Sequence, residues 1–469
     1  MSSSQMRNKL EQAAEEMSVS AWEEQIRSAP YRSYLYSYPH KTAYRELERK
    51  IPLEELWADE PAETFLLYMH IPFCGARCGF CNLFTLPDKR TGAHEQYVDA
   101  LERQARQWAP HVAHKKFARF AVGGGTPTLL EPALLDRVFR IAEDVMGLDS
   151  GEASISVETS PETVTAERLD ILRAHRVDRV SMGIQSFVDA EAAAIYRPQM
   201  PLVVEKALEQ LKRVKFPILN LDLIYGLPGQ TVQTWLYSLE RALAYEPEEI
   251  FIYPLYTRDH TIVKPEEIRQ RGTDIRMACY TAARDRLLAA GYTQYSMRRF
   301  ARANASSPKT LLPYGCQEEG MVGLGCGARS YTKNVHYATR YAVSRSATAG
   351  IIADYVAAER HDLIDYGFVL DEAEQKRRFI LKALLHREGL ELASYVSRFG
   401  TEALEDYPEL NRLTETGLAE HVPGTGTGAG AGAGGIFRLT DDGIALSDSI
   451  GDWFISPETR VRMEGYTFA

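Results

Sequence analysis

The sequence has no long apolar run and no excess of basic residues. No stretch approaches the roughly 18 consecutive apolar residues of a membrane-spanning helix, and residues 1–25 lack the basic start and apolar centre of a signal peptide. Lys and Arg number 54 against 64 Asp and Glu, which gives a formal net charge of −10. We therefore expect a cytoplasmic protein that binds neither membranes nor nucleic acid as its main partner.

Cysteine is scarce, with six residues in a chain of 469. Three of them, Cys74, Cys78 and Cys81, follow an apolar run with the spacing C-x3-C-x2-C, and the others are scattered: Cys279, Cys316 and Cys326. Three such thiolates can hold three irons of a [4Fe–4S] cluster and leave the fourth iron open for chemistry. The alternatives are a zinc site, which usually needs a second ligand pair, or free buried thiols. The spacing favours the cluster.

Short apolar runs alternate with amphipathic helical stretches between residues 63 and 300. The expected strands are Phe65–Ile71, Phe117–Val122, Ala153–Val157, Arg179–Ile184, Ile218–Ile224 and Ile250–Leu255. Strands separated by helices indicate a parallel sheet with right-handed crossovers. Six repeats predict an α/β fold with a partial (β/α)6 TIM-like barrel, and a doubly wound sheet is the alternative. In both folds the site lies at the C-terminal ends of the strands.

The chain on either side of the barrel has a different character. Residues 1–62 are expected to form an N-terminal arm, and residues 301–353 an irregular, glycine-rich connection that contacts a second ligand. Residues 354–469 are expected to form a mostly helical C-terminal domain of winged-helix type. Within it, the low-complexity stretch 424–435 (GTGTGAGAGAGG) predicts a flexible hairpin or linker without chemistry.

Glycine and polar residues stand at the ends of the expected strands. Gly123, Gly124 and Gly125 follow the second strand, where a bare backbone can approach the amino-acid end of a cofactor, or simply make a tight turn. Glu158 ends the third strand and can accept hydrogen bonds from a ribose diol or an ammonium group. The alternative for Glu158 is a charge at the start of the following helix.

The fourth and fifth strands add three further polar candidates. Gln185 ends the fourth strand among apolar residues and must find partners. Asp222 lies inside the fifth strand, where a charge is costly unless it is paired. Arg197 is the expected partner of Asp222, and the alternative for Arg197 is a surface cation without a role in the site. Together these residues predict a ring of polar groups around one cofactor.

Four motifs resemble the radical S-adenosylmethionine superfamily, in its coproporphyrinogen III oxidase-like (HemN-type) branch. They are Tyr68-x-His-Ile-Pro-Phe-Cys74-x3-Cys78-x-Phe-Cys81, Gly-Gly-Gly-Thr-Pro-Thr at 123–128, Ser-Met-Gly-Ile-Gln-Ser-Phe at 181–187 and Asp-Leu-Ile-Tyr-Gly-Leu-Pro-Gly-Gln at 222–230. The resemblance spans about residues 63–335 and extends more weakly to residues 439–448. It implies that the open iron binds S-adenosylmethionine, whose reductive cleavage gives a 5′-deoxyadenosyl radical that takes hydrogen from an unactivated carbon.

The resemblance also implies which residues serve the cofactors. Cys74, Cys78 and Cys81 would be the cluster ligands and the catalytic residues. The residues implied to contact S-adenosylmethionine are Tyr68, Phe80, Gly124, Gly125, Thr126, Glu158, Gln185, Arg197 and Asp222. Members of this branch can hold a second S-adenosylmethionine, for which Gly325 and Gly327 are the expected contacts. Free structural thiols are the expected role of Cys316 and Cys326.

Two departures from the branch bear on the reaction. Leu83 stands where the porphyrinogen oxidases usually carry a further cysteine, and residues 312–319 lack the His-Asn-x-x-Tyr-Trp stretch of the haem chaperones. The sequence therefore favours methyl or methylene transfer to an sp2 carbon of a small substrate, including cyclopropanation, with two S-adenosylmethionines. Coproporphyrinogen III dehydrogenation and haem carriage are the alternatives. A flavodoxin- or ferredoxin-like protein is the expected electron donor, and a methyltransferase is a further candidate partner.

Overall fold

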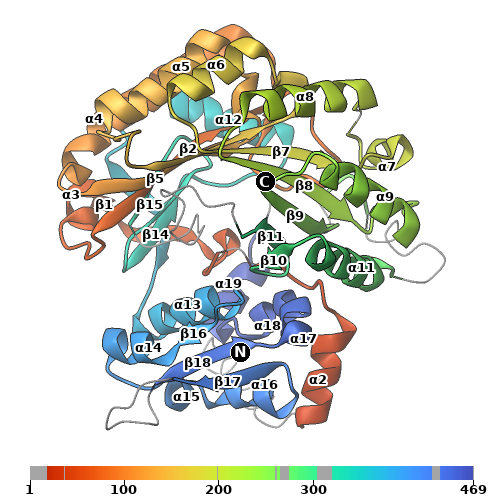
Figure 1. Cartoon of the computed structure of the whole chain (residues 1–469). Coiled ribbons are helices and arrows are strands. Elements are labelled where there is room, and N and C mark those ends of the chain that lie inside the picture. The colour runs from red at the N-terminus through yellow and green to blue at the C-terminus, as the bar shows by residue number, and fades with distance from the viewer. Residues whose placement is uncertain are drawn as a thin grey trace. The chain divides into compact units, whose positions relative to one another are not determined.

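The described part of the chain forms two compact units (Figure 1). The computed structural model describes residues 18–467 apart from residues 36, 198, 259–260, 265–273, 304–319 and 425–433. Residues 45–293 and 301–369 make up one unit, here called the barrel unit. Residues up to 44, residues 294–300 and residues 370–466 make up the smaller unit. The domain boundaries expected at residues 62, 300 and 353 stay a prediction.

Six parallel strands form the centre of the barrel unit. They are β2 (Thr64–Ile71), β5 (Lys116–Gly124), β6 (Ser154–Thr159), β7 (Arg179–Gln185), β8 (Ile218–Tyr225) and β9 (Glu249–Pro254). Each strand pairs in parallel with the next. The helices that follow them in turn are α4 (Thr91–Val112), α5 (Pro132–Arg140), α6 (Ala166–Ala174), α8 (Pro201–Val214), α9 (Val232–Leu243) and α11 (Arg276–Ala289). This alternation confirms the predicted partial (β/α)6 barrel, and every expected strand overlaps an observed one.

The barrel strand β6 carries apolar residues on one face and polar residues on the other. Side chains at successive positions of a strand point to opposite faces. On β6, Ile155 and Val157 are fully buried, whereas Ser156 and Glu158 alternate with them and lie in register with Arg179 and Ser181 of β7. The apolar residues pack beneath the surrounding helices, which leaves the polar residues to line the interior of the barrel.

The central sheet continues beyond β2. β12 (Met321–Leu324) pairs with β2 in parallel. The further strands are β13 (Arg329–Tyr331), β14 (Val335–Ala338), β15 (Leu363–Val369) and β1 (Arg45–Pro52), each antiparallel to its neighbour. The expectation of irregular structure for residues 301–353 is therefore wrong where that segment is described. Its strands are three or four residues long and are defined by pairing with distant segments, which a local pattern does not reveal.

The smaller unit contains a three-stranded antiparallel sheet with helices around it. The sheet has the order β16 (Leu390–Glu391), β18 (Gly435–Leu439) and β17 (Ala419–Pro423). Its helices include α2 (Val19–Ser28), α13 (Glu372–Leu384), α14 (Leu392–Phe399), α18 (Ser447–Trp453) and α19 (Pro457–Glu464). The helices and the small sheet agree with the expected winged-helix type. Gly424 N donates to Gly434 O at 3.0 Å, so the ends of the low-complexity stretch are paired, while its residues 425–433 lie outside the described residues.

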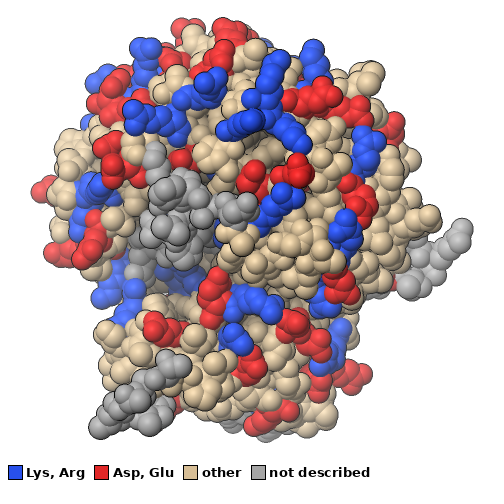
Figure 2. All heavy atoms as spheres, viewed as in Figure 1, with Lys and Arg blue, Asp and Glu red and all other residues tan. Residues whose placement is uncertain are grey.

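Two surface properties bear on possible partners. Among the described residues, no helix combines the length and the apolar character needed to cross a bilayer. Figure 2 shows Lys and Arg interspersed with Asp and Glu over the face in view. Mixed charge of this kind differs from the continuous basic surface that is typical of nucleic-acid binding.

Candidate active site

The cysteine loop begins where β2 ends. Cys74 closes the short strand β3 (Phe73–Cys74), which pairs with β4 (Leu86–Pro87). All three cysteines of the motif are free thiols that are partly exposed. Gly79, between the second and third cysteines, donates from its N–H to Ile195 O at 2.8 Å and accepts at its carbonyl from Ile262 N and Val263 N at 2.9 and 3.1 Å. These bonds fix the loop against the segment that follows β7 and the segment that follows β9.

Each sulfur in the loop lies beside a hydrogen-bond donor. Arg197 Nη1 donates to Cys78 Sγ at 3.3 Å, and Thr126 Oγ1 donates to Cys74 Sγ at 3.9 Å. Cys81 Sγ is 3.8 Å from Thr85 Oγ1. Donors of this kind stabilise a thiolate, and hydrogen bonds to sulfur tune a metal centre. In the described part of the chain, no three His, Cys, Asp or Glu side chains are arranged to share a single metal ion.

The thiols influence one another electrostatically. Burial, with a smaller contribution from Cys81, raises the pKa of the Cys74 thiol to about 12. Burial also raises the pKa of Cys81, and Cys78 raises it further. Cys74 and Cys81 therefore resist ionisation. A metal centre that binds them must displace their protons, because the thiolate is the ligand form.

The glycine loop after β5 packs directly against the cysteine loop. Gly125 N donates to Ile71 O at 2.8 Å, and Thr126 N donates to Phe73 O at 2.7 Å. A Cβ on Gly125 would lie 2.4 Å from Phe73 O and 3.0 Å from Cys74 Sγ. Gly124 has a positive φ of 115°. The glycines therefore allow a backbone approach to the cysteines that larger residues would block.

The two carboxylates predicted at strand ends lie in the barrel interior. Glu158 Oε2 accepts a hydrogen bond of 3.0 Å from Gly124 N, which joins the ends of β5 and β6. The residue keeps an exposed surface, yet protein surrounds its carboxyl group closely enough that burial raises the pKa to about 7, with Asp222 adding to the rise. Burial likewise raises the pKa of Asp222, against the opposing influence of Arg179.

The expected ion pair between Arg197 and Asp222 is wrong. Asp222 accepts hydrogen bonds from Asn220 Nδ2 at 2.8 Å and from Ser181 Oγ at 3.2 Å. Arg197 instead donates to Cys78 Sγ and, through Nη2, to Gly183 O at 2.6 Å. A long arginine side chain reaches several partners, and the sequence does not show that the cysteine loop lies on the same side. Arg197 Nε has no hydrogen-bond partner among the described residues.

Gln185 ends β7 in a left-handed conformation with a φ of 72°. This conformation is uncommon for residues other than glycine and concentrates at functional sites. Its neighbour Gly183 leaves the space that both Gln185 and Arg197 occupy, because a Cβ there would lie 2.6 Å from Gln185 Nε2 and 3.6 Å from Arg197 Nη2. The structure thus brings Gln185 and Arg197 together at the end of β7.

Two aromatic candidates flank the cysteine loop. Tyr68 is partly buried on β2, and its hydroxyl lies 3.1 Å from His70 Nδ1. Phe80 packs on a buried cluster that includes Ile195 and Val263. The structure adds His70 to the site, a residue that the sequence did not predict there. Its Nε2 lies 2.9 Å from Phe84 O, and its ring lies beside Gly124. Its position inside the Tyr68-x-His motif was the available signal.

The loop proposed for a second ligand also lies beside His70. Gly325 and Gly327 have positive φ values of 90° and 91°. A Cβ on Gly325 would lie 2.7 Å from His70 O, and one on Gly327 would lie 2.9 Å from His70 Nε2. Cys326 between them is fully buried, with its Sγ 3.8 Å from Tyr97 Oη, and burial raises its pKa to about 12. Cys316 lies outside the described residues.

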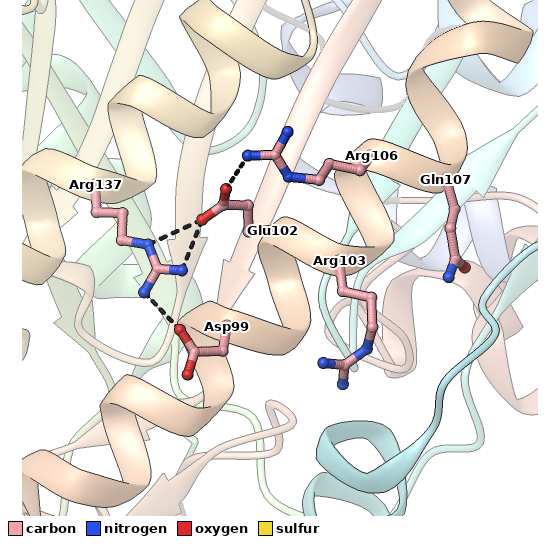
Figure 3. Close-up of a pocket in the computed structure, with 6 residues that line it drawn as sticks. All are labelled: Asp99, Glu102, Arg103, Arg106, Gln107 and Arg137. Carbon is pink, nitrogen blue, oxygen red and sulfur yellow. Dashed lines mark hydrogen bonds and ion pairs between the residues drawn. The ribbon is translucent and has the colours of Figure 1, made fainter.

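A shallow pocket of about 320 Å³ lies elsewhere on the barrel unit, along α4 and α5 (Figure 3). Arg137 pairs there with Asp99 and Glu102, each at 2.6 Å, and Glu102 also pairs with Arg106. Arg103 donates to two backbone carbonyls. None of the candidate site residues lines this pocket, and its charged groups already satisfy one another.

Comparison with known proteins points to one superfamily. Residues 68–242 match the family model described as the radical SAM superfamily. An oxygen-independent coproporphyrinogen III oxidase of Salmonella typhimurium is 26% identical over 422 residues, which cover 83% of this chain and 88% of that protein. A heme chaperone HemW of Bacillus subtilis is 29% identical over 270 residues, 56% of this chain and 70% of the relative.

A solved structure agrees with the fold. Coproporphyrinogen III oxidase (HemN) from Escherichia coli, described as a radical SAM enzyme, superposes with a TM-score of 0.72 over 90% of this chain and 96% of that one. The sequence identity in that superposition is 22%. The barrel and the smaller unit therefore share their architecture with that protein.

Proposed function

The chain belongs to the radical S-adenosylmethionine superfamily, in its coproporphyrinogen III oxidase-like branch, and on this basis we propose that it oxidises propionate side chains of a porphyrinogen-type substrate. The observation that carries this proposal is the similarity to an oxygen-independent coproporphyrinogen III oxidase over 83% of the chain, well beyond the cofactor motifs. In such a reaction a propionate side chain loses one hydrogen atom, CO2 and one electron, and becomes a vinyl group. The electron passes to an external acceptor.

The residues of the cysteine loop fit the cluster that the family implies. Cys74, Cys78 and Cys81 would each hold one iron and leave the fourth iron open. The hydrogen-bonding group beside each sulfur and the missing Cβ at Gly125 support this assignment. With both groups bound, the cluster and S-adenosylmethionine supply a one-electron cleavage that yields a carbon radical able to take a substrate hydrogen.

The chain's own residues would bind and orient S-adenosylmethionine. The backbone of Gly124 to Thr126 would meet its methionine end, and Glu158 would accept hydrogen bonds from its ribose. Gln185 and Asp222 would bind its other polar groups. Arg197, which donates to a cysteine sulfur and has an unpaired buried Nε among the described residues, supplies a donor at the junction between the cluster loop and the cofactor. Tyr68 and Phe80 would pack beside them.

Methyl or methylene transfer with two S-adenosylmethionines is the second candidate. Leu83 favours this candidate, because it stands where the oxidases usually carry a further cysteine. The side chain of Leu83 is 47% exposed. The Gly325–Gly327 loop beside His70 supports a second S-adenosylmethionine site. A methyltransferase is an expected partner only for this second candidate reaction. Haem carriage is a third alternative, and the missing His-Asn-x-x-Tyr-Trp stretch counts against it.

One experiment separates these reactions. Protein with a reconstituted cluster is reduced by a flavodoxin, the proposed type of electron donor, and incubated anaerobically with S-adenosylmethionine carrying a labelled methyl group. Coproporphyrinogen III is offered in one series and aromatic or alkene acceptors in another. The proposal expects 5′-deoxyadenosine, CO2 and vinyl product from coproporphyrinogen III. Label in an acceptor with the porphyrinogen unchanged would establish methyl transfer, and stable haem binding without 5′-deoxyadenosine would establish a carrier.

A further inference from the structure

The interior of the barrel contains a buried ion pair that the sequence motifs do not include. Arg179 of β7 donates from Nε to Glu249 Oε2 of β9 at 2.7 Å, and its side chain is 7% exposed while that of Glu249 is 1% exposed. Arg179 Nη1 also donates to Ser156 Oγ of β6 at 3.2 Å. One arginine thus connects three strands on the polar face of the barrel.

The ion pair lies next to the two carboxylates proposed to bind S-adenosylmethionine. Ser181, Asn220 and Glu249 stand side by side in register on β7, β8 and β9. Asn220 Nδ2 donates to both Ser181 Oγ and Asp222 Oδ1, at 2.7 and 2.8 Å. The polar layer is therefore continuous from the ion pair to Asp222.

The charges of this layer are unequal. The strands β6 to β9 carry three carboxylates, Glu158, Asp222 and Glu249, and Arg179 is their only Lys or Arg. Buried ion pairs are seldom more stabilising than well-packed apolar residues, because both charges lose their hydration. Stability alone is thus a weak reason for this pair, whereas its electrostatic effect on neighbouring carboxylates is direct.

We propose that Arg179 is a positioning residue for the cofactor site, whose positive charge favours the ionised forms of Asp222 and Glu158, the forms that accept hydrogen bonds from S-adenosylmethionine. Glu249 holds the guanidinium in place and moderates its charge. The proposal rests on the proposed function, since it assumes that these two carboxylates contact S-adenosylmethionine. Arg179 itself acts through them.

The electrostatic influences have the required directions. Arg179 lowers the pKa of both Asp222 and Glu158, and Glu249 raises that of Asp222. The two carboxylates also oppose each other's ionisation. Two further groups approach the same region: Arg197 enters from the segment after α7 (Asp189–Ala194), and His70 lies on β2 beside the glycine loop.

Two single substitutions should shift cofactor binding in opposite directions along the pH scale. Arg179→Gln removes the cation, so Asp222 and Glu158 hold their protons up to a higher pH. As the pH is lowered, S-adenosylmethionine binding should therefore be lost at a higher pH than in the wild type. We expect affinity at neutral pH to fall on the order of tenfold, the value of one charge-assisted hydrogen bond. Glu249→Gln leaves Arg179 with less opposing charge, so binding should persist to lower pH than in the wild type.

The test is calorimetric titration of S-adenosylmethionine into cluster-reconstituted protein across acidic to alkaline pH. Arg179→Lys keeps the charge and should restore part of the wild-type profile. If a lone buried charge prevents folding, Arg179→Gln combined with Glu249→Gln leaves an uncharged pair that should fold and still bind poorly at neutral pH. Arg137→Gln, which removes a surface arginine on α5, is the matched control and should leave the profile unchanged.

The outcomes distinguish this inference from the proposed function. Opposite shifts for Arg179→Gln and Glu249→Gln support the inference. Equal losses at every pH, with equal losses of thermal stability, would mean a structural role and would overturn it. Failure of the wild-type protein to bind S-adenosylmethionine at any pH would instead overturn the proposed function.

Discussion

Arg197 Nη1 lies 3.3 Å from Cys78 Sγ, and the same guanidinium donates through Nη2 to Gly183 O in β7. One side chain thus ties the cysteine loop to the end of a barrel strand on which Gln185 adopts a positive φ. The position of the loop over the barrel therefore depends on a contact between segments 119 residues apart.

Replacing Arg197 should alter the cluster as well as turnover. Arg197→Gln removes a charged donor to a cysteine sulfur, and such donors favour the reduced state of an iron–sulfur cluster. We expect a lower reduction potential in an anaerobic redox titration followed by electron paramagnetic resonance, together with at least a roughly tenfold loss in 5′-deoxyadenosine formation. Arg197→Lys retains the charge without the planar two-pronged geometry. Its reduction potential and its rate of 5′-deoxyadenosine formation should lie between those of the wild type and Arg197→Gln. An unchanged potential in Arg197→Gln would contradict the assigned contact.

A methyl group on Gly125 should disrupt the cysteine loop. It would meet Phe73 O at 2.4 Å and Cys74 Sγ at 3.0 Å, and overpacking of this kind costs about 1–3 kcal/mol. We expect Gly125→Ala to lower the free energy of unfolding in denaturant titrations and to reduce iron incorporation. Gly350→Ala is the matched control, because nothing lies within 4 Å of its Cβ in α12 (Arg345–Ala357). Full iron loading of Gly125→Ala would show that the close approach is unimportant.

Glu158 should make stability of the cluster-free protein decline with rising pH. Its pKa is raised from 4.5 to about 7 in the folded chain, so the folded state binds the proton more tightly than the unfolded state does. The stabilisation from this proton is present below the unfolded-state pKa and is lost as the pH rises through the folded-state pKa. Because Glu158 keeps exposed surface, solvent reduces the effect.

The substitution Glu158→Gln tests this dependence. Unfolding in urea at several pH values should show a decline between about pH 4.5 and pH 7 in the wild type that is smaller in the variant. The variant should gain stability relative to the wild type as the pH increases. A parallel pH dependence of the two proteins would contradict the raised pKa.

The second S-adenosylmethionine site proposed at the Gly325–Gly327 loop predicts a second binding event. Gly327 has a φ of 91°, and its Cβ would lie 2.6 Å from the Phe84 ring and 2.9 Å from His70 Nε2. We expect equilibrium dialysis of reconstituted protein to give two S-adenosylmethionines per chain, and Gly327→Ala to bind one. Binding of a single S-adenosylmethionine to the wild type would remove the support for a second site.

The sequence predicted the barrel well because its strands carry local signals. The run Ile218–Ile224, for example, is apolar except for Asn220 and Asp222 and stands between two helical stretches, and β8 (Ile218–Tyr225) extends it by one residue. β12 and β13 carry no comparable signal: Gly323 lies where a Cβ would be 2.1 Å from Arg329 O, so their pairing depends on contacts that only the folded chain makes. Strands of three or four residues are too short for a recognisable alternation.

The sequence also predicted only part of the candidate site. The motif residues could be placed at strand ends, but the sequence does not determine which polar side chain meets which. Arg197 was paired with Asp222, whereas the cation whose charge acts on Asp222 is Arg179. Polar residues that alternate with apolar ones on β7 and β8 were the available signal for Arg179 and Asn220, because such alternation predicts a polar barrel interior. Glu249 begins β9 and had no such signal.

The most direct test of the account is the comparison of wild-type protein with Cys78→Ala after anaerobic reconstitution with iron and sulfide. The account predicts about four irons and four sulfides per wild-type chain and 5′-deoxyadenosine formation from S-adenosylmethionine after reduction. It also predicts that Cys78→Ala loses both, while Cys279→Ala, outside the motif, keeps both. Retention of the cluster and of 5′-deoxyadenosine formation in Cys78→Ala would contradict it.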